Sequence, residues 1–286
     1  MNTVGGVPAP LPRLPHGAGS WIAPPRPGWE QRLREQRPFV SIITPSFNQA
    51  RYLEQTITSV LAQGYDRLEY IVMDGGSTDG SFDIIRRYAD RLAYWVREPD
   101  GGQVDAIVRG MRRSSGDVVA YINSDDYYLA GAIAAAIEHF AAQPAPGFVY
   151  GSGLIVDEGG NELGRVPAAP FDLDRMVHGA MTLVQPSAFF LREALFHVGP
   201  FSADLEYVFD WDMFIRIGKR FGAAATGAVL AAIRDYPTTK TNTGGFGRCE
   251  QIRRLVEHHR GQPLTLGYLH YHMLELEHAL ASRGFD

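Results

Sequence analysis

The first half of the chain alternates between short apolar runs and stretches in which apolar residues recur every three or four positions. The apolar runs suit buried strands and cover Phe39–Thr44, Leu68–Asp74, Ala93–Glu98 and Val119–Ile122. The stretches between them have the spacing of one helix face, as in Leu53, Ile57, Val60 and Leu61, in Phe82, Ile85 and Leu92, and in Val104, Ile107, Val108 and Met111. Strands joined by single helices imply right-handed crossovers, so the pattern predicts an α/β fold with a largely parallel sheet flanked by helices.

The pattern changes after Gly147. A hairpin is predicted around Gly159–Asn161, a further strand over Ser187–Arg192 and a helix over Phe209–Phe221. From about Arg248 the chain has the pattern of an amphipathic helical tail that is rich in His, Leu and Glu. We expect this tail to serve packing or association, including formation of a homo-oligomer through its helices.

The start of the chain differs from the rest because it is rich in proline and glycine and has no sustained periodicity. Such a segment buries too little apolar surface to offset its ordering entropy. We therefore expect a flexible or surface-draped arm that Trp21, Ile22 and Trp29 hold to the body. The predicted organisation is an arm over 1–37, one α/β domain over 38–247 and a helical extension over 248–286.

Composition narrows the classes of function. The chain has 286 residues, 45% of them hydrophobic, which is enough for one large core or two modest ones. A net charge of -5 argues against nucleic-acid binding, because phosphate contacts demand an excess of Lys and Arg. No apolar run reaches the ~20 residues that span a bilayer, and no signal-peptide pattern is present, so a cytoplasmic location is expected. The single cysteine, Cys249, fits a reducing compartment.

Candidate chemistry gathers where three predicted strands end, in "TPSFN" (Thr44–Asn48), "MDGGSTDG" (Met73–Gly80) and "INSDD" (Ile122–Asp126). Open α/β sheets bind ligands at this edge. The first of these turns contains no glycine, which excludes the glycine-rich turn of a dinucleotide-binding fold. A divalent cation held by carboxylates can neutralise phosphates instead, and Asp125 is the candidate ligand, with Asp126 and Asn123 beside it.

The first two strand ends suit a nucleotide base. Pro45 and Phe47 can form an apolar wall against a flat ring, and Asp74 can accept a hydrogen bond from a base N–H. Two structural alternatives remain open at this point. Phe47 can be a core aromatic, and Asp74 can cap the turn that follows it.

These segments, together with "EPDGGQVDA", "QPSAFF", "VGPFSADLEYVFDWDMFIRI" and "TKT", resemble the family-two glycosyltransferases of the GT-A fold over roughly Pro38–Thr243. The resemblance implies a Rossmann-like sheet and an inverting transfer of sugar from a nucleoside-diphosphate donor, with Mg²⁺ or Mn²⁺ on the diphosphate. It implies base contacts by Pro45, Phe47 and Asp74, and places Asp100 near the donor. Asn123 and Asp125 match the outer positions of the family's D-x-D motif, with Asp125 as the metal ligand, and Asp210 matches the catalytic base. Asn123 departs from the motif because it is neutral.

The base can also be argued from the chemistry of inversion, in which one carboxylate takes a proton from the attacking hydroxyl. Asp210 and Asp212 start one predicted helix and project about 200° apart at ~100° per residue, so they cannot share a role. We expect Asp210 to face the cleft and Asp212 to stabilise the helix N-terminus or orient the acceptor loop. In the alternative interpretation both acids only cap the helix.

Three further residues are candidates for substrate contact. Trp211 can stack on an acceptor sugar, although packing is the alternative role, and Gln185 is expected to shape the acceptor side. Lys240, in a polar loop, can close over the diphosphate or can remain a solvated lysine.

The sequence thus predicts a metal-dependent, inverting glycosyltransferase with a hydroxyl of a glycan or a lipid-linked molecule as acceptor. UDP is the expected nucleotide because Asp74 suits the uracil N3–H, although thymine and guanine present comparable groups. A lipid-linked acceptor would place the protein at the inner face of the membrane by peripheral association. Two alternatives remain: a catalytically silent sugar-nucleotide or glycan-binding module, and a nucleotidyltransferase, which needs a basic, glycine-rich loop after its first strand.

Overall fold

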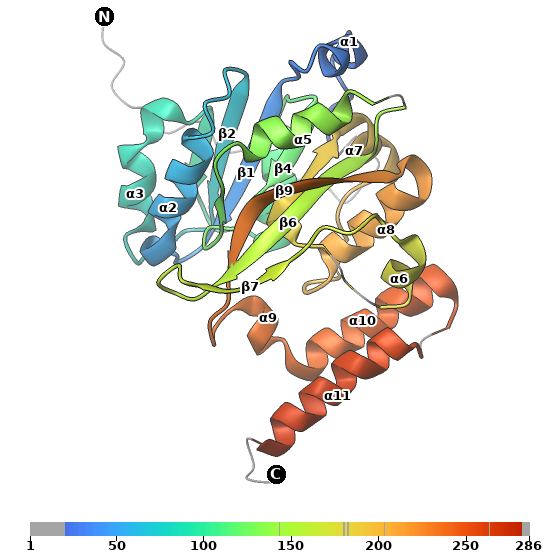
Figure 1. Cartoon of the computed structure of the whole chain (residues 1–286). Helices are drawn as coiled ribbons and strands as arrows, with labels where there is room; N and C mark the ends of the chain where they lie inside the picture. The colour runs from blue at the N-terminus through green and yellow to red at the C-terminus, as the bar shows by residue number, and fades with distance from the viewer. Residues whose placement is uncertain are drawn as a thin grey trace, which may run out of the picture.

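The computed structural model describes residues 21–281 except 143, 180, 182, 203 and 263. The described residues form one mixed sheet with the strand order β3-β2-β1-β4-β8-β6-β9-β5, and β7 pairs with β6 outside this path (Figure 1). The strands are β1 (Val40–Ser46), β2 (Leu68–Asp74), β3 (Tyr94–Arg97), β4 (Val118–Tyr121), β5 (Tyr127–Tyr128), β6 (Phe148–Val156), β7 (Glu162–Val166), β8 (Ala188–Leu191) and β9 (Ala223–Arg234).

The part of the sheet predicted from the apolar runs is parallel. β1 lies between β2 and β4, with Val40 paired to both Leu68 and Val118. All seven residues of β1 and all four of β4 are buried, as expected for strands covered on both faces. Because these strands run in the same direction, the polar residues that follow them meet at one edge of the sheet. The prediction of a mixed α/β sheet is confirmed.

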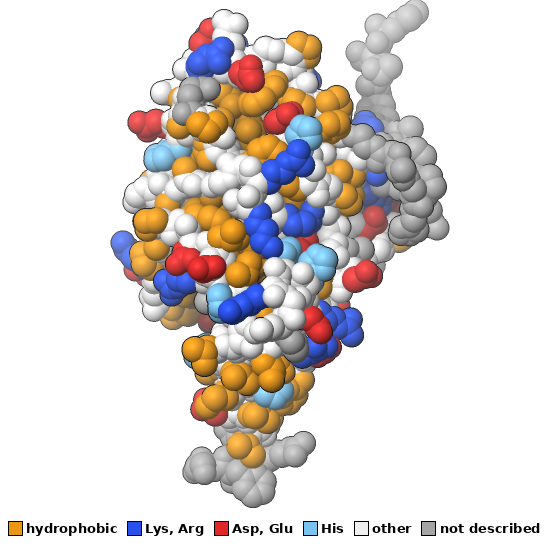
Figure 2. Space-filling model, turned by 90° about the vertical axis from the view of Figure 1, so that its right-hand side faces the viewer, with side chains coloured by type: hydrophobic (Ala, Val, Ile, Leu, Met, Phe, Trp, Pro, Cys, Tyr) orange, Lys and Arg blue, Asp and Glu red, His pale blue; other side chains and the backbone are white. Residues whose placement is uncertain are grey.

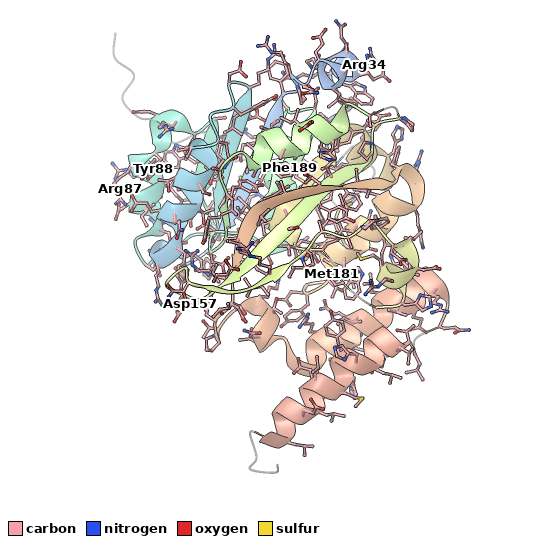
Figure 3. The ribbon with its side chains drawn as sticks, viewed as in Figure 1. Arg34, Arg87, Tyr88, Asp157, Met181 and Phe189 are labelled. Atoms are coloured by element: carbon pink, nitrogen blue, oxygen red, sulfur yellow. The ribbon has the colours of Figure 1, made fainter. Side chains whose placement is uncertain are left out.

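The second part of the sheet is mainly antiparallel. β8 pairs with both β4 and β6 in antiparallel fashion, and β6 and β7 form the predicted hairpin, with Asp157 at its turn (Figure 3). β9 runs parallel to β6 and was not predicted, because its sequence is dominated by alanine and lacks strand-forming alternation. β9 ends at Arg234, at the same edge where the polar turns gather.

Helices cover the sheet and extend from one end of it (Figure 1). They are α1 (Trp29–Arg34), α2 (Ala50–Leu61), α3 (Ser81–Arg87), α4 (Gln103–Arg113), α5 (Ala132–Phe140), α6 (Leu173–Val177), α7 (Arg192–Val198), α8 (Phe209–Phe221), α9 (Lys240–Thr243), α10 (Gly245–Arg260) and α11 (Leu266–Ala281). α4 packs on β1 and β2, and α5 packs on β6 and β9. α8 contributes Phe214, whose ring stacks on Phe190 at 5.6 Å and meets Phe148 at 5.2 Å. These contacts fix the helix that begins with Asp210 against the sheet.

The part of the predicted arm that the structure describes packs on the body. Trp21 and Ile22 are buried, and the Trp21 indole N–H donates to the Leu195 carbonyl at 3.1 Å. Arg32 forms an ion pair of 2.6 Å with the fully buried carboxylate of Asp117. Residues 1–20, which make up the rest of that arm, lie outside the described residues, as do residues 282–286 of the helical extension.

The helical extension consists of α10 and α11, which pack against each other and project from the sheet (Figures 1 and 2). Cys249 on α10 is buried. Within the described residues, no helix is both long enough and apolar enough to cross a membrane.

Candidate active site

A cavity of about 1110 Å³ opens where β1, β2 and β4 end. One part of its wall comes from the strand ends and the loop before α4, and the other comes from the second half of the chain. Of the residues predicted from the sequence, it is lined by Pro45, Phe47, Asp100, Asn123, Asp125, Gln185, Asp210, Trp211 and Lys240. Residues that are about 165 positions apart in the chain, Pro45 and Asp210, therefore share one cavity.

Phe47 lies at the rim of this cavity and is 62% exposed. A large apolar ring held in solvent at a cavity wall is available for stacking, so the alternative of a core aromatic is excluded. The next residue, Asn48, has a left-handed backbone with φ of 52°, and its side-chain oxygen accepts a hydrogen bond from the Thr78 N–H. These contacts hold the turn after β1 against the turn after β2.

Asp74 does not reach the cavity, which corrects the prediction that it contacts the base. Its side chain is 1% exposed, and its two carboxylate oxygens accept hydrogen bonds from the N–H and the hydroxyl of Ser77. The Ser77 hydroxyl oxygen in turn accepts from the Asn48 N–H. Asp74 therefore caps its own turn and ties the first two strand ends together, which was the structural alternative.

Asp100 packs against Gly75, the residue that follows Asp74, and occupies the space that a side chain at position 75 would need. A Cβ atom added to Gly75 would lie only 2.8 Å from Asp100 Oδ2. Asp100 Oδ1 accepts from the Gly102 N–H at 2.8 Å, which leaves Oδ2 facing Gly75 in the cavity wall. Burial raises the pKa of Asp100 above its ordinary value. Asp100 Oδ2 thus accepts no hydrogen bond from the described residues and lies in the wall of the cavity that Phe47 and Pro45 also line.

Asp125 lines the cavity and is held by residues that the sequence did not single out. The Tyr236 hydroxyl donates to Asp125 Oδ2 at 2.8 Å, and the Arg234 guanidinium donates to the Asp125 backbone carbonyl. Among the described residues, no three side chains of His, Cys, Asp and Glu form a metal-binding group. Mg²⁺ is commonly held by one or two carboxylates together with substrate phosphates and water, so a single oriented carboxylate fits a metal that arrives with a diphosphate.

Asp126, beside Asp125, has a structural role. It is 5% exposed, and it accepts hydrogen bonds from the Arg234 backbone N–H and the Asn123 side-chain amide. Burial, and then the neighbouring charge of Asp125, raise the pKa of Asp126 well above its ordinary value. An aspartate at position 123 would face this buried carboxyl group, which gives a physical reason for the neutral Asn123 in the D-x-D position.

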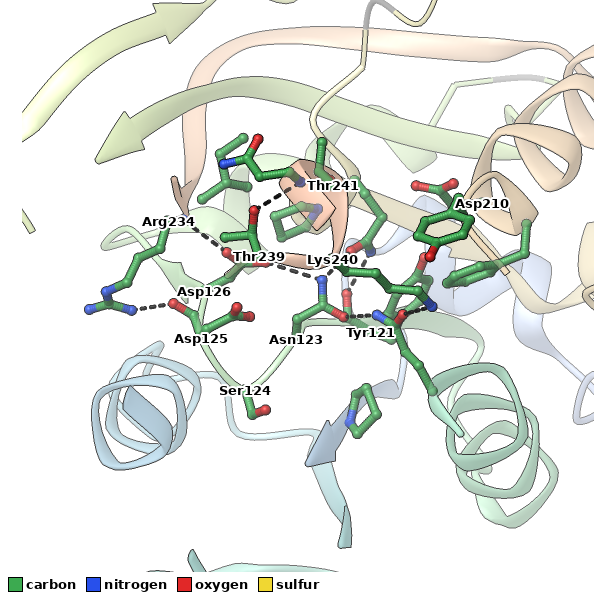
Figure 4. A pocket seen from close by; sticks show the side chains of 18 of the residues that line it. Tyr121, Asn123, Ser124, Asp125, Asp126, Asp210, Arg234, Thr239, Lys240 and Thr241 are labelled. Carbon is green, nitrogen blue, oxygen red and sulfur yellow. Dashed lines mark hydrogen bonds between the residues drawn. The ribbon is translucent and has the colours of Figure 1, made fainter. Parts of the chain in front are cut away.

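Lys240 is partly enclosed by the cavity, with 37% of its side chain exposed. Its ammonium group donates to Gln103 Oε1 at 3.0 Å and lies 3.8 Å from Glu206, and burial lowers its pKa. The Gln103 side-chain amide in turn donates to Asn123 Oδ1 at 2.7 Å, so Gln103 links Lys240 to Asn123. Figure 4 shows this chain of hydrogen bonds between Lys240 and Asn123, with Asp125 and Asp210 to either side of it. Lys240 therefore places a positive charge inside the cavity.

Asp210 faces the same cavity from the first turn of α8. One of its oxygens accepts from the Trp211 N–H at 2.8 Å. Burial raises its pKa to about 6, against the opposing effects of this hydrogen bond and of the positive charges of Arg248 and Lys240. A carboxylate with a pKa near 6 is ionised at neutral pH and is basic enough to accept a proton from a hydroxyl group.

Asp212 is not among the residues that line the cavity, which leaves no direct contact with the acceptor for it. It is 4% exposed and accepts hydrogen bonds from His259 at 2.8 Å and Arg216 at 2.7 Å. Burial tends to raise its pKa, but these two partners lower it below the ordinary value. Since His259 lies on α10, Asp212 joins the helical extension to α8.

Trp211 lines the cavity but exposes little surface on which an acceptor sugar could stack. Its side chain is 2% exposed, and its indole N–H donates to the Met176 carbonyl at 3.0 Å. The ring meets Tyr271 of α11 edge-on at 6.2 Å, which is the packing role kept open as the alternative. Gln185 also lines the cavity and is fixed by hydrogen bonds to the Tyr121 carbonyl and from Asn123.

Comparison with known proteins identifies the chain. Residues 41–197 match the model of Glycosyl transferase family 2. An uncharacterized glycosyltransferase of Mycobacterium tuberculosis is 32% identical over 234 residues, which are 79% of this chain and 86% of the relative. The chain belongs to glycosyl transferase family 2. The family predicted from the sequence motifs, and with it the glycosyltransferase activity, is confirmed.

Two solved structures share the fold of this family 2 glycosyltransferase. The mannosyltransferase PcManGT from Pyrobaculum calidifontis, in complex with GDP-Man and Mn²⁺, is 21% identical with a TM-score of 0.59, over 92% of this chain and 77% of that chain. S. aureus TarS 1–349, in complex with UDP-GlcNAc, is 17% identical with a TM-score of 0.56, over 76% of this chain and 65% of that chain. The predicted GT-A fold is confirmed.

The cavity residues of this family 2 glycosyltransferase that the sequence analysis missed include Gln103, Arg234, Tyr236 and Arg248. Gln103 lies within "EPDGGQVDA", so its motif was noticed although its side chain was not. Arg234 ends the unpredicted strand β9 and Tyr236 follows it, while Arg248 lies in the first turn of α10, which was assigned only to packing or association. None of the three carried a local pattern that pointed to the cavity.

Proposed function

We propose that this glycosyltransferase moves a sugar from a nucleoside-diphosphate donor to a hydroxyl group, with inversion at the anomeric carbon and with Mg²⁺ or Mn²⁺ on the diphosphate. The observation that carries the proposal is the shared cavity, in which Asp125 and Lys240 can hold a diphosphate while Asp210 faces the same space. One base on one side of the transferred sugar and charge stabilisation on the other are what inversion requires.

The donor diphosphate is proposed to lie between Asp125 and Lys240. Asp125 would hold the metal ion, because Tyr236 fixes one of its oxygens and leaves the other available. The chemistry that a bound Mg²⁺ or Mn²⁺ supplies is neutralisation of the charge that builds on the leaving diphosphate. Lys240 adds a second positive charge to this part of the cavity, where burial strengthens its effect.

Asp100, and not Asp74, is proposed to accept the hydrogen bond from the base. Phe47 and Pro45 form the apolar wall, and Asp100 offers one free oxygen because Gly102 occupies the other. A single acceptor suits the lone N3–H of uracil better than the two adjacent N–H groups of guanine, which a carboxylate binds with both oxygens. This supports UDP as the nucleotide.

The nucleotide preference gives the first test. We expect UDP with Mn²⁺ to raise the melting temperature more than GDP does, since a ligand that binds only the native state stabilises it. Asp100→Asn should lower UDP affinity by about tenfold, the effect of one hydrogen bond to a charged group. Asp90→Asn, an exposed change outside the cavity, is the matched control.

The outcomes of this test separate the proposals. An equal shift with UDP and GDP, unchanged in Asp100→Asn, would contradict the base contact. Release of UDP from a bound UDP-sugar, followed over time, distinguishes an enzyme from a silent binding module. A protein that binds UDP-sugars with Mn²⁺ and never releases UDP, with or without acceptor, would favour the module.

The acceptor is proposed to be a hydroxyl of a glycan or a lipid-linked molecule, approaching Asp210 from the side of Gln185. On this proposal, Asp210 takes the hydroxyl proton as the oxygen attacks the anomeric carbon. A lipid-linked acceptor would be met at the inner face of the membrane. Gln185 is held rigidly through Tyr121 and Asn123, so it can position a sugar hydroxyl without reorganising.

We further propose that α11 pairs with α11 of a second copy. Its exposed apolar residues follow a three-four spacing, the spacing of the seam of a two-stranded coiled coil, at Leu266, Leu269, Met273, Leu276 and Leu280. Figure 2 shows hydrophobic side chains gathered on the projecting end of the molecule. The helix sequence contains two Glu and no Lys or Arg. This charge disfavours an anionic membrane surface and leaves an identical apolar seam as the better partner.

This association is tested by light scattering after gel filtration. We expect a dimer for the wild type and at least tenfold weaker association for Leu276→Glu, because a charge buried in an apolar seam is unpaired. Leu274→Glu is the control, since Leu274 is an exposed leucine of the same helix outside the seam. A monomeric wild type at 100 µM would contradict the proposal, and co-sedimentation of that monomer with anionic vesicles would assign α11 to a membrane instead.

A further inference from the structure

Arg248 is a cavity residue that the reaction described above does not use. It lines the cavity from the first turn of α10, and its guanidinium lies over the Tyr271 ring of α11 at 5.1 Å. Its positive charge is close enough to lower the pKa of Asp210. Arg248 is therefore a cation beside the candidate base, held in place by an aromatic ring.

The charge of Arg248 is not neutralised by a direct partner. Among the described residues, its side chain makes no ion pair within 4.0 Å and donates no hydrogen bond. The neighbouring arginines of the same helix behave differently, since Arg253 pairs with Glu250 and Glu257, and Arg254 pairs with Glu250. A partly buried guanidinium without a counter-ion, with its donors open to a cavity, is suited to an anionic ligand.

The position of Arg248 sets it apart from the donor groups. Asp125 belongs to the turn after β4, at the strand ends, whereas Arg248 and its ring partner Tyr271 belong to the helical extension. The lining near Arg248 includes Tyr207, whose ring also lies 5.7 Å from the Lys240 ammonium, and Glu206. Lys240 is already engaged by Gln103 and Glu206, and on the proposed function it serves the donor diphosphate together with Asp125 and a metal ion. Arg248, which has no such partner among the described residues, is the cation left for the acceptor.

We propose that Arg248 binds an anionic group of the acceptor, a carboxylate or a phosphate, and so sets the acceptor hydroxyl against Asp210. This inference rests on the proposed function, because it assigns the acceptor class of the same site. The planar guanidinium can give two parallel hydrogen bonds to either anion, and contact with the Tyr271 face leaves its edge free for them. An acidic sugar residue or a lipid phosphate would satisfy this chemistry.

The competing role for Arg248 is electrostatic, in which it only lowers the pKa of Asp210. The two roles predict different results. An anion-binding residue discriminates between acidic and neutral ligands of the same shape. A residue that only adjusts the base changes the pH dependence of turnover and has no effect on that discrimination.

The experiment compares matched pairs of acceptor probes in the presence of UDP and Mn²⁺. Octyl glucuronide and octyl glucoside differ by a carboxylate, and geranyl phosphate and geraniol differ by a phosphate. Binding is measured by calorimetry for wild type, Arg248→Gln and Arg254→Gln, the last being an exposed arginine of the same helix. We expect at least one acidic probe to bind about tenfold tighter than its neutral partner in wild type and Arg254→Gln, and this ratio to fall to about one in Arg248→Gln.

The two pairs also identify the source of the anion, because preference for the glucuronide indicates an acidic glycan and preference for geranyl phosphate indicates a lipid phosphate. A wild type that does not discriminate within either pair overturns the inference. So does an Arg248→Gln protein that keeps the wild-type ratio, including one in which only the pH profile of UDP release has moved. Failure of UDP and Mn²⁺ to bind the wild type would instead contradict the proposed function itself.

Discussion

Asp210→Asn is expected to lower sugar transfer by about 10²–10⁴-fold, the range for loss of a general base, while UDP and Mn²⁺ still bind. Asparagine keeps the size of the side chain but cannot take the proton of the acceptor hydroxyl. Neutralising a buried carboxyl group whose pKa is raised to about 6 also removes a cost to folding at pH 7.5, so the melting temperature should stay equal or rise. Rates of UDP release with acceptor, and thermal shifts with UDP, measure the two effects.

Asp212→Asn is the informative control for Asp210→Asn. Asp212 stabilises the fold through His259 and Arg216 and does not line the cavity, so this variant should lose stability and keep most of its turnover. If both acids only capped the helix, the two variants would behave alike. Full activity in Asp210→Asn would remove Asp210 from the mechanism.

The pH dependence provides a second readout of the same base. Below pH about 6 Asp210 becomes protonated, so kcat/KM should fall about tenfold for each pH unit on the acid side and level off above pH 7. The residual activity of Asp210→Asn should lack this inflection. An acid limb that persists unchanged in the variant would belong to another group.

Asp125→Ala is expected to abolish the metal-dependent part of donor binding, weakening UDP by about 100-fold in the presence of Mn²⁺. The reason is that Asp125 lines the cavity with one oxygen held by Tyr236, while the adjacent Asp126 is buried and bonded to Arg234 and Asn123. Titration of UDP with Mn²⁺ and with EDTA measures the effect. Removal of the metal should weaken UDP binding in wild type to the level of Asp125→Ala.

The controls for Asp125→Ala follow from its surroundings. EDTA should have no further effect on the variant, because the metal no longer contributes to binding. Tyr236→Phe removes only the hydrogen bond that orients the carboxylate, so its loss should be smaller, about tenfold. Equal UDP affinity in wild type with and without metal would contradict a metal-bound diphosphate at Asp125.

The local spacing of apolar residues was sufficient to predict the parallel part of the fold. The strand predicted over Leu68–Asp74 has those bounds in the structure, and so does the helix over Phe209–Phe221, because their apolar spacing is strong and their neighbours in the chain break it. β9 was missed because its alanines have little strand propensity. Pairing with β6 determines its conformation, and a partner in the tertiary structure is not visible in local sequence.

The sequence by itself determined the family, and it predicted the sheet edge that carries the candidate chemistry and the candidates Asp125 and Asp210, which lie where an apolar run meets acids. Only the tertiary structure decided which carboxylates are free to act. Asp74 and Asp212 have the same side chain as Asp100 and Asp210. Ser77 nevertheless binds both oxygens of Asp74, and His259 and Arg216 bind those of Asp212. A side chain's chemistry is fixed by its type, but its availability depends on which distant groups fold against it, and that is settled by packing.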